Sequence, residues 1–359
     1  MKSKILKLGI IGGGQLGMFL AKAAKDNNIE PYVYSNTKNA PAEKYTKKIF
    51  YGSFDDKSKL TSFSNKVDII TYEFENISIS SLVEIQKRKI IFPPINALSI
   101  AQNRAKEKMF FQKNKIKHAK SFFLNSRQDL DNIKSSLKFP VILKTTRFGY
   151  DGKGQSVAKN YNDLIRFWKN LNFVPCIIEK KIKLQKELSV VCARDQNRNI
   201  FCFPVFRNIH KNHILFETFS PSGVERKLEN KLIKISKKIL NKLSYVGVLT
   251  IEFFIDQQGK IYANELAPRV HNSGHITLDN SKNSQFDQHI RAICGLDLIK
   301  SNVVKKGVMR NLLGQDIKNI KKISKESKYK RFKKVLVYSY NKKEVREGRK
   351  MGHLNFIKE

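Results

Sequence analysis

Hydrophobic and polar residues follow two different patterns along the chain, and the change falls near residue 100. In the first part, short apolar runs typical of strands alternate with stretches whose apolar residues recur at helical spacing. The strand-like runs cover 4–11, 32–34, 67–74 and 89–92. After the first run, one helical face carries Leu16, Phe19, Leu20, Ala23 and Ala24. This alternation predicts a parallel sheet with helices on both faces, a Rossmann-like domain over residues 1–104.

From about residue 105 the chain is dominated by consecutive strands with short turns, which is typical of antiparallel sheet. Helices are expected at 103–114, 126–137 and 226–243. Strands are expected at 122–124, 140–145, 176–182, 186–194, 199–206, 213–219, 246–256 and 260–268, and near the end at 307–313, 334–340 and 353–357. We therefore predict a mixed α/β and α+β chain with a central domain over 105–300 and a small C-terminal β domain over 301–359.

Composition excludes several classes of protein. A chain of 359 residues with 41% hydrophobic residues is globular, and no run approaches the ~20 apolar residues that cross a bilayer. The four cysteines show no CxxC spacing and three lie in apolar runs, so we expect them to be reduced and buried in a cytoplasmic protein. The net charge of +38 comes from lysines spread along the chain. This favours compositional drift and a general attraction for phosphorylated ligands over nucleic-acid binding.

A glycine turn follows the first strand. The sequence GGGQLG (12–17) satisfies G-x-G-x-x-G, whose amides favour an anion at the start of the helix. A dinucleotide enzyme would also need an acidic residue at the end of the second strand, where this chain has Tyr-Ser-Asn (34–36). We therefore expect a phosphate-bearing substrate here, with a purely structural turn as the alternative. Glu73 and Glu75 end the third strand and should point the same way, toward a hydroxyl- or amine-bearing ligand, unless they are ordinary strand-end polarity.

A lysine and a glycine-rich loop occur together in the central domain. Lys144 ends a predicted strand, and residues 149–155 (GYDGKGQ) follow with three glycines. The backbone N–H groups of such a loop can approach phosphates closely. The spacing differs from that of a P-loop, and a plain hairpin loop is the alternative.

Two carboxylates and a carboxamide are expected to meet across a hairpin. Glu252 lies on one predicted strand and Asn264 and Glu265 on the next. Each lies in an apolar run, where an uncompensated carboxylate would be costly. The pattern predicts a Mg²⁺ site that holds nucleotide phosphates, with one surface acid and one capping acid as the alternative.

Two further motifs carry charge. His271 and His275 are four residues apart, but proline, asparagine, serine and glycine make the segment a loop, so the helical spacing of a zinc site is absent. Arg269 beside the predicted metal carboxylates suits an anionic substrate such as bicarbonate. The basic, glycine-containing stretch 343–353 is either a phosphate-binding loop or a solvated face.

Taken together, these motifs resemble the ATP-grasp superfamily and, within it, the 5-(carboxyamino)imidazole ribonucleotide synthases. The matching strings run in the same order over nearly the whole chain: GGGQLG (12–17), TYEFEN (71–76), QNRAKEK (102–108), YDGKGQ (150–155), NELAPRVHNSGH (264–275), SQFDQHIRAICGL (284–296) and EVREGRKMGHLN (344–355). The resemblance implies a homodimer and a Rossmann-like domain followed by an ATP-grasp domain. It also implies a reaction in which ATP phosphorylates bicarbonate and the amine of 5-aminoimidazole ribonucleotide takes up the carboxyl group. ATP and Mg²⁺ are the implied cofactors.

The same resemblance implies roles for individual residues. ATP would be held by Arg104, Lys144, Gly149, Tyr150, Asp151, Gly152, Lys153, Gly154, Gln155, Glu179, Lys180, Lys181, Ile182, Glu187, His210, Asn264 and Glu265. Mg²⁺ would lie on Glu252 and Glu265, and bicarbonate and the amine among Tyr150, Asp151, Lys153 and Arg269, with Asp151 steering the proton of the amine. The ribonucleotide would be bound by Gln15, Leu16, Glu73, Lys343, Arg349 and Lys350.

The sequence departs from the family pattern in a few places. Lys153 stands where arginine is often expected, Lys180 and Lys181 make the hinge more basic, and the lysine-rich segment 315–334 matches nothing assignable. The nearest rival functions are a formate-dependent glycinamide ribonucleotide transformylase and a biotin carboxylase; NSGH and REGRKMGH favour the imidazole substrate. A basic RNA-binding protein is the rival from another class, and it would have no need of two buried carboxylates.

Overall fold

The computed structural model describes residues 5–149, 154–300 and 304–359. The N-terminal strands are β1 (Lys7–Ile11), β2 (Glu30–Ser35), β3 (Ile49–Tyr51), β4 (Ile69–Tyr72) and β5 (Ile90–Ile91). They form a parallel sheet in the order β3-β2-β1-β4-β5, as the alternating pattern predicts. The main helices of this part are α1 (Gln15–Asp26), α2 (Lys57–Ser64), α3 (Ile79–Gln86) and α4 (Ile95–Ala101). Neither β3 nor α2 was predicted.

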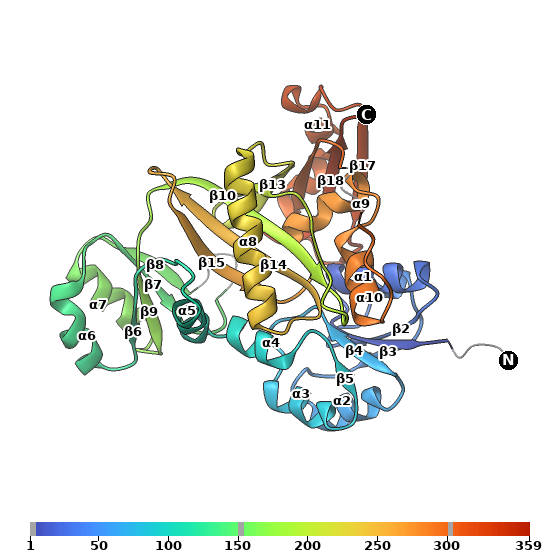
Figure 1. The fold of residues 1–359 in the computed structure, drawn as a ribbon, viewed down its shortest axis with the longest axis horizontal. Coiled ribbons are helices and arrows are strands. Elements are labelled where there is room, and N and C mark those ends of the chain that lie inside the picture. Colours follow the sequence, from blue (N-terminus) through green and yellow to red (C-terminus); the bar gives the residue numbers. More distant parts are fainter. Residues whose placement is uncertain (1–4, 150–153, 301–303) are drawn as a thin grey trace.

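A small antiparallel sheet follows, drawn at the left of Figure 1. Its strands are β6 (Ser121–Leu124), β7 (Val141–Thr145), β8 (Gln155–Ala158) and β9 (Cys176–Lys180), in the order β6-β9-β7-β8. The accompanying helices are α5 (Arg104–Lys113), α6 (Arg127–Ile133) and α7 (Tyr161–Asn170). Trp168 of α7 and Leu130 of α6 pack with the buried side chains of this sheet in one apolar cluster.

The remaining strands form one large antiparallel sheet in the order β15-β14-β10-β12-β13-β16-β18-β17, with β11 paired to β10. Its central strands are β10 (Leu184–Arg194), β11 (Ile200–Cys202), β12 (Phe206–Lys211), β13 (Ile214–Ser220), β14 (Gly247–Asp256) and β15 (Ile261–Ala267). The C-terminal strands β16 (Gly307–Leu313), β17 (Lys334–Ser339) and β18 (Lys350–Ile357) continue the same sheet. The single strand predicted at 199–206 is wrong, because the chain bends between β11 and β12 and only β12 pairs with β13. The domain boundaries at 104 and 300 stay predictions.

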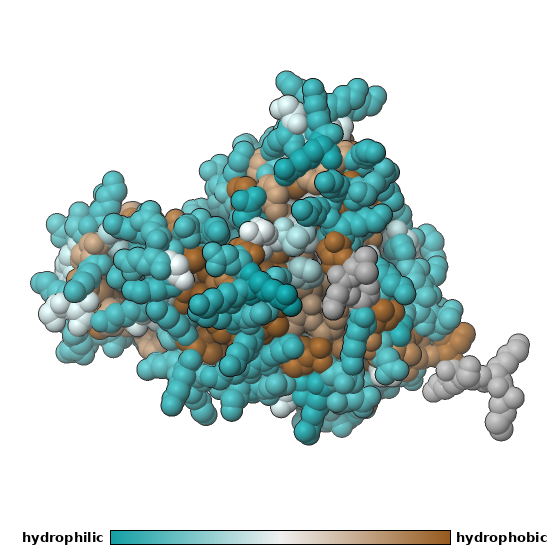
Figure 2. All heavy atoms as spheres, turned by 45° about the horizontal axis from the view of Figure 1, so that its top comes forward, coloured by the Kyte–Doolittle hydropathy of each residue, from teal (hydrophilic) through white to brown (hydrophobic). Residues whose placement is uncertain are grey.

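Helix α8 (Arg226–Lys242) lies across the large sheet (Figure 1). Its buried Leu232 and Ile239 belong to the same apolar cluster as Leu188 and Val190 of β10. None of the described helices combines the length and apolar character needed to cross a bilayer. Figure 2 shows hydrophilic residues over most of the visible face, with hydrophobic residues emerging between them toward its middle.

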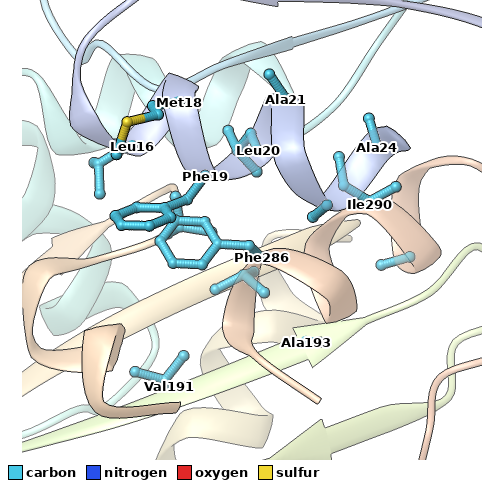
Figure 3. Packing of buried hydrophobic residues seen from close by; sticks show 14 of the residues in the cluster. Leu16, Met18, Phe19, Leu20, Ala21, Ala24, Val191, Ala193, Phe286 and Ile290 are labelled. Carbon is cyan, nitrogen blue, oxygen red and sulfur yellow. The ribbon is translucent and has the colours of Figure 1, made fainter. Parts of the chain in front are cut away.

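The N-terminal part is joined to the large sheet through α10 (Gln285–Ile293). Leu16 and Phe19 of α1 belong to the same buried cluster as Phe286 and Ile290 of α10 and Val191 of β10. Figure 3 shows α1 and α10 facing each other through these side chains, with the β10 residues below them. One core therefore runs from the N-terminal parallel sheet and its helices into the large sheet and fixes the two relative to each other.

The cysteine expectation is wrong for one pair. The structure joins Cys192 of β10 to Cys202 of β11 in a disulfide, while Cys176 and Cys294 are free. The two strands are antiparallel and their register puts the two residues directly opposite each other, with a Cα–Cα distance of 4.1 Å. Directly opposed positions are the closest side-chain neighbours in a sheet, but spacing in the sequence alone does not show which strands pair.

Candidate active site

A cavity of about 630 Å³ lies where the N-terminal part, the small sheet and the large sheet meet. Residues from all three parts line it, from Gln15 and Leu16 of α1 through Lys144 of β7 to Glu252 of β14. The C-terminal strand β18 contributes Lys350. The other predicted residues among its lining are Arg104, Gly149, Gln155, Glu179, Lys180, Lys181, Ile182, Glu187, His210, Asn264, Glu265 and Arg269.

A buried ion-pair cluster forms one wall. Glu179 at the end of β9 accepts from Lys144 Nζ at 2.5 Å and lies 3.1 Å from Lys108 Nζ. Burial opposes ionisation of Glu179, but the two lysines outweigh it and hold its pKa near 2. The carboxylate is therefore fully ionised, and it fixes Lys144 at the edge of the cavity.

Lys108 was not assigned a role by the sequence analysis. It is buried on α5, and its Nζ donates to the backbone carbonyl of Asn264 at 2.6 Å. Its neighbour Glu107 accepts the backbone N–H of Leu266 at 2.7 Å, and burial raises the pKa of Glu107 to about 7. These two residues attach α5 to β15, the strand that carries Glu265. The available signal in the sequence was a charged pair, Glu107 and Lys108, directly before the apolar residues 109–111 of the expected helix.

The glycine-rich loop is anchored by Arg104. Its guanidinium donates to the carbonyls of Thr145 at 2.8 Å and Gly149 at 3.0 Å. A Cβ at Gly149 would meet the Arg104 guanidinium at 2.3 Å, so a larger residue here would displace the guanidinium from its present position. Arg104 is therefore bound to the base of the loop. Four residues predicted for the loop, Tyr150, Asp151, Gly152 and Lys153, lie outside the described residues.

The far end of the loop meets the large sheet. The amide of Gln155 lies 3.1 Å from Nδ1 of His213, and the carbonyl of Gly154 accepts from the backbone of Thr145. Across the cavity, Glu187 and His210 form a close hydrogen bond between β10 and β12. Burial alone would lower the pKa of His210, but the Glu187 carboxylate outweighs it and raises the pKa above its ordinary value.

The two predicted metal carboxylates face each other. The register of β14 and β15 pairs Glu252 with Glu265 and then skips Asn264, because a bulge lets Phe253 pair with Ala263. Such a bulge redirects side chains, and here Asn264 and Glu265 both line the cavity. Burial and the charge of Glu265 raise the pKa of Glu252 well above its ordinary value.

This pair suits a divalent cation. Two close carboxylates repel each other, and a cation between them removes that repulsion. The described residues contain no cluster of three or more histidine, cysteine, aspartate or glutamate side chains placed for a metal. Mg²⁺ does not require one, because it commonly binds one or two carboxylates and completes its shell with water and phosphate oxygens.

On the side toward the N-terminal part, the cavity is lined by Arg269, Lys350 and His271. Arg269 pairs with Glu75 at 2.8 Å and donates to the carbonyl of Val270. Nε2 of His271 lies 3.5 Å from Oε1 of Glu252. Burial, with Arg269 and Lys350 nearby, lowers the pKa of His271 well below its ordinary value. The imidazole of His271 is therefore neutral, and the sequence analysis had considered it only as a zinc ligand.

Glu73 is placed differently from the expectation. The strand ends at Tyr72, so alternation does not continue, and Glu73 turns under the glycine turn to accept the N–H of Gly14 at 2.8 Å. Gly12 has a φ of +117°, and a Cβ there would meet the Glu73 side chain at 2.5 Å. Among the described residues, Glu75 lines the cavity and Glu73 does not. The anion on this turn is thus the protein's own carboxylate.

The C-terminal basic loop also differs in detail. Lys343 is exposed, and Arg349 donates to the carboxylate and carbonyl of Glu344. Lys342 is the more buried lysine and donates to the carbonyl of Lys350 at 2.8 Å. Burial and the charges of Arg349 and Lys350 outweigh Glu73 and lower the pKa of Lys342 to about 8.

The chain matches three families in succession. The Ribonucleotide synthetase preATP-grasp domain covers residues 5–102, the ATP-grasp domain 109–286, and the Phosphoribosylaminoimidazole carboxylase C-terminal domain 307–359. The chain is also similar to N5-carboxyaminoimidazole ribonucleotide synthase of Bacillus subtilis strain 168. The two are 38% identical over 352 residues, which cover 98% of this chain and 91% of that protein.

Two solved structures extend the comparison. One is N5-carboxyaminoimidazole synthetase from Staphylococcus aureus complexed with ADP, with a TM-score of 0.91, 34% identity and coverage of 99% of this chain and 94% of that one. The other is the Aspergillus clavatus N5-carboxyaminoimidazole synthase in complex with ADP and 5-aminoimidazole ribonucleotide. It has a TM-score of 0.89, 25% identity and coverage of 98% and 94%. These similarities confirm the ATP-grasp architecture that the sequence predicts.

Proposed function

The chain belongs to the N5-carboxyaminoimidazole ribonucleotide synthase family of ATP-grasp ligases, and from this membership we propose that it carboxylates the amine of 5-aminoimidazole ribonucleotide with ATP and bicarbonate. The products are N5-carboxyaminoimidazole ribonucleotide, ADP and phosphate, in purine biosynthesis. One observation carries the proposal: three charged pairs, Lys144–Glu179, Glu252–Glu265 and Arg269–Glu75, line a single cavity. In this proposal the nucleotide is served by Lys144 and Glu179, the cation by Glu252 and Glu265, and the reacting anions by Arg269 and Glu75, all in the same cavity.

The nucleotide is assigned to the side formed by the small sheet. Lys144 and Arg104 would bind its phosphates, with the loop 149–155 as the cover. The hinge residues 179–182 would contact the adenine base. Glu187 would hold the ribose, and His210 would lie beside it. Supporting this assignment, Lys144 is held at the cavity by an ionised Glu179 and so presents a positive charge there. Glu252 and Glu265 would hold Mg²⁺, which would neutralise the phosphoryl oxygens.

The carboxylation step is assigned to the opposite side. Transfer of the γ-phosphoryl group to bicarbonate gives carboxyphosphate and ADP; the amine then attacks the carboxyphosphate, or the carbon dioxide that it releases, and phosphate leaves. Arg269 would stabilise the anions, because its guanidinium is always charged and is oriented by Glu75. Tyr150, Asp151 and Lys153 complete this part of the proposal, with Asp151 receiving the proton that the amine loses. A closed loop would protect carboxyphosphate from water.

The ribonucleotide is assigned to the space between α1 and β18, where Gln15, Leu16 and Lys350 line the cavity. Its phosphate would be attracted by the basic loop, and here we favour Lys342 over Lys343 as the ligand because Lys342 is the more buried and feels the charge of Glu73. Glu73 and Arg349 remain in the proposal as groups that shape this subsite. A homodimer in the cytoplasm is the further expectation from the family resemblance.

The deciding experiment measures phosphate release from ATP with Mg²⁺ and bicarbonate, with and without 5-aminoimidazole ribonucleotide. Strong stimulation by the ribonucleotide is expected. Turnover without stimulation would contradict the acceptor and make glycinamide ribonucleotide the next substrate to try. No turnover from a folded, nucleotide-binding protein would contradict the proposed activity itself.

A further inference from the structure

A line of buried hydrogen bonds runs from the middle of the large sheet to the cavity. Thr218 of β13 donates from Oγ1 to Oδ1 of Asn208 on β12 at 3.0 Å. Nδ2 of Asn208 donates to Oγ of Ser189 on β10 at 3.0 Å, and Ser189 donates to Oγ of Ser273 at 2.9 Å. Ser273 Oγ lies 2.9 Å from Nδ1 of His271, which lines the cavity. Apart from His271, each member is at least nine-tenths buried.

The state of the His271 ring follows from one backbone contact. The N–H of Ser273 donates to Nδ1 of His271 at 3.3 Å, so this nitrogen caps the short helix that begins at Asn272. An amide N–H can only donate, and the nitrogen that receives it therefore carries no proton. The single ring proton of His271 then lies on Nε2, which is the nitrogen directed at Glu252.

The direction of the whole line is fixed at both ends. Because Nδ1 of His271 is an acceptor, the Ser273 hydroxyl donates to it, and its lone pairs are left to accept from Ser189. At the other end, the nitrogen of the Asn208 amide can only donate and its oxygen can only accept. No hydroxyl in the line can turn around without leaving a buried group unpaired, which is unfavourable.

We propose that Thr218, Asn208, Ser189 and Ser273 are positioning residues that hold His271 as an Nε2–H donor toward Glu252. The donor lies 3.5 Å from Oε1 of Glu252, so it orients that carboxylate and leaves the other oxygen for the cation and the nucleotide. The part of this inference that concerns the cation rests on the proposed function. The part that concerns the His271 tautomer rests on the hydrogen bonds alone.

The test uses variants at two buried positions of the line, Ser189 on β10 and Thr218 on β13. Ser189→Ala breaks the line in its middle, and Thr218→Val removes its first donor while keeping the shape of the side chain. Thr218→Ser keeps the hydroxyl and should restore wild-type behaviour. The matched control is Thr250→Val on β14, because Thr250 is fully buried and its hydroxyl has no hydrogen-bond partner among the described residues.

Two readouts separate this inference from the proposed function. In nucleotide-free protein labelled with ¹⁵N-histidine, the ring nitrogens of His271, identified with His271→Gln, should show the proton on Nε2. Ser189→Ala and Thr218→Val should shift the Nδ1 resonance, whereas Thr218→Ser and Thr250→Val should not. In turnover assays, the first two variants should raise the Mg²⁺ concentration at half-maximal rate about fivefold, which is typical for one lost hydrogen bond.

Two results would overturn the inference. A wild-type proton on Nδ1 would contradict it directly, and so would His271 resonances and Mg²⁺ dependence that Ser189→Ala and Thr218→Val leave unchanged. If the wild-type enzyme had no turnover, the proposed function would fail, and the nitrogen resonances would still decide the tautomer. If Ser189→Ala did not fold, the comparison of Thr218→Val with Thr218→Ser would provide the test.

Discussion

Nε2 of His289 lies 2.8 Å from the hydroxyl of Thr71, although 218 positions separate the two residues in the chain. The other ring nitrogen, Nδ1, accepts the backbone N–H of Val248 at 3.0 Å. His289 therefore links β4, which leads to Glu75, with β14, which carries Glu252. The ring is fully buried, and burial lowers its pKa to about 3. It belongs to the string SQFDQHIRAICGL, for which the sequence suggested a family but no role.

This link makes stability depend on pH in a definite direction. In the unfolded chain His289 titrates near ~6.5, so below that pH the unfolded state binds a proton that the folded state does not. The stability that neutral His289 contributes is complete above about pH 6.5 and is lost as the pH falls, at up to ~1.4 kcal/mol per pH unit. His289→Asn keeps an acceptor for Val248 but does not titrate. Urea unfolding should show it ~1–3 kcal/mol less stable than wild type at pH 7.5, with the gap reduced by ~1 kcal/mol at pH 5.5.

Burial also lowers the pKa values of His271, His275 and His353. These three histidines affect the pH dependence of stability equally in both proteins. The difference between the variant and wild type therefore reports on His289. A gap that stays constant between the two pH values would contradict the neutral, buried state of His289.

A second prediction concerns the paired carboxylates. Glu265→Gln should abolish ATP turnover, because one of two cation ligands becomes neutral, yet it should leave the fold intact. The charge of Glu265 helps raise the pKa of Glu252, so its removal relieves repulsion in the protein without Mg²⁺. Thermal unfolding in EDTA should therefore show an equal or higher midpoint for the variant, and added Mg²⁺ with ADP should stabilise it less than wild type. Near-normal turnover would rule out the metal assignment.

Local patterns predicted those parts of the molecule whose partners are near in sequence. The apolar face of α1 is buried as expected, with Leu16 and Phe19 in the core, because helical spacing alone determines a face. The pairing of Glu252 with Glu265 followed from a hairpin with a short turn. Both results depend on geometry that extends over a few residues.

The contacts that the sequence did not reveal join segments far apart in the chain. Lys108 meets Asn264 across 156 positions. Glu73 turns under Gly14 because β4 ends one residue before it. Nothing local distinguishes Lys342 from Lys343, since burial in the folded chain is what separates them.

That difference between neighbouring lysines gives a third prediction. Lys342 has a pKa of about 8, so it is charged below this pH and loses its attraction for a phosphate above it. The KM for the ribonucleotide should rise in wild type as the pH increases from 7 to 9. Lys342→Met should raise KM roughly tenfold at pH 7 and flatten this pH dependence, the tenfold change corresponding to ~1.4 kcal/mol. Lys343→Met is the matched control and should behave like wild type; equal effects of the two would contradict the assignment.

The last prediction concerns Lys108, which has three acceptors around one buried ammonium group. It lies 3.1 Å from Glu179, 3.7 Å from Glu107 and 2.6 Å from the carbonyl of Asn264. Removing one partner of a buried ion pair leaves an uncompensated charge, at a cost of ~3–5 kcal/mol. Lys108→Met should therefore lower the free energy of unfolding by that amount. Lys106→Met, on the exposed side of the same helix, should change it by less than ~0.5 kcal/mol.

The carboxylate that most needs Lys108 can be identified with a second substitution. Burial already raises the pKa of Glu107 to about 7, so Glu107 is easily neutralised. In wild type Lys108 and Lys144 together hold the pKa of Glu179 near 2, and Lys144 remains in the variant, so Glu179 should retain its charge there. Adding Glu179→Gln to Lys108→Met should recover more stability than adding Glu107→Gln. The ADP affinity of Lys108→Met, measured by calorimetry, should also fall, because Asn264 loses a fixed neighbour and Glu179, which holds Lys144, loses one of its two lysines. If the Glu107 substitution rescued stability better, the buried cluster would be centred on α5 rather than on the nucleotide hinge.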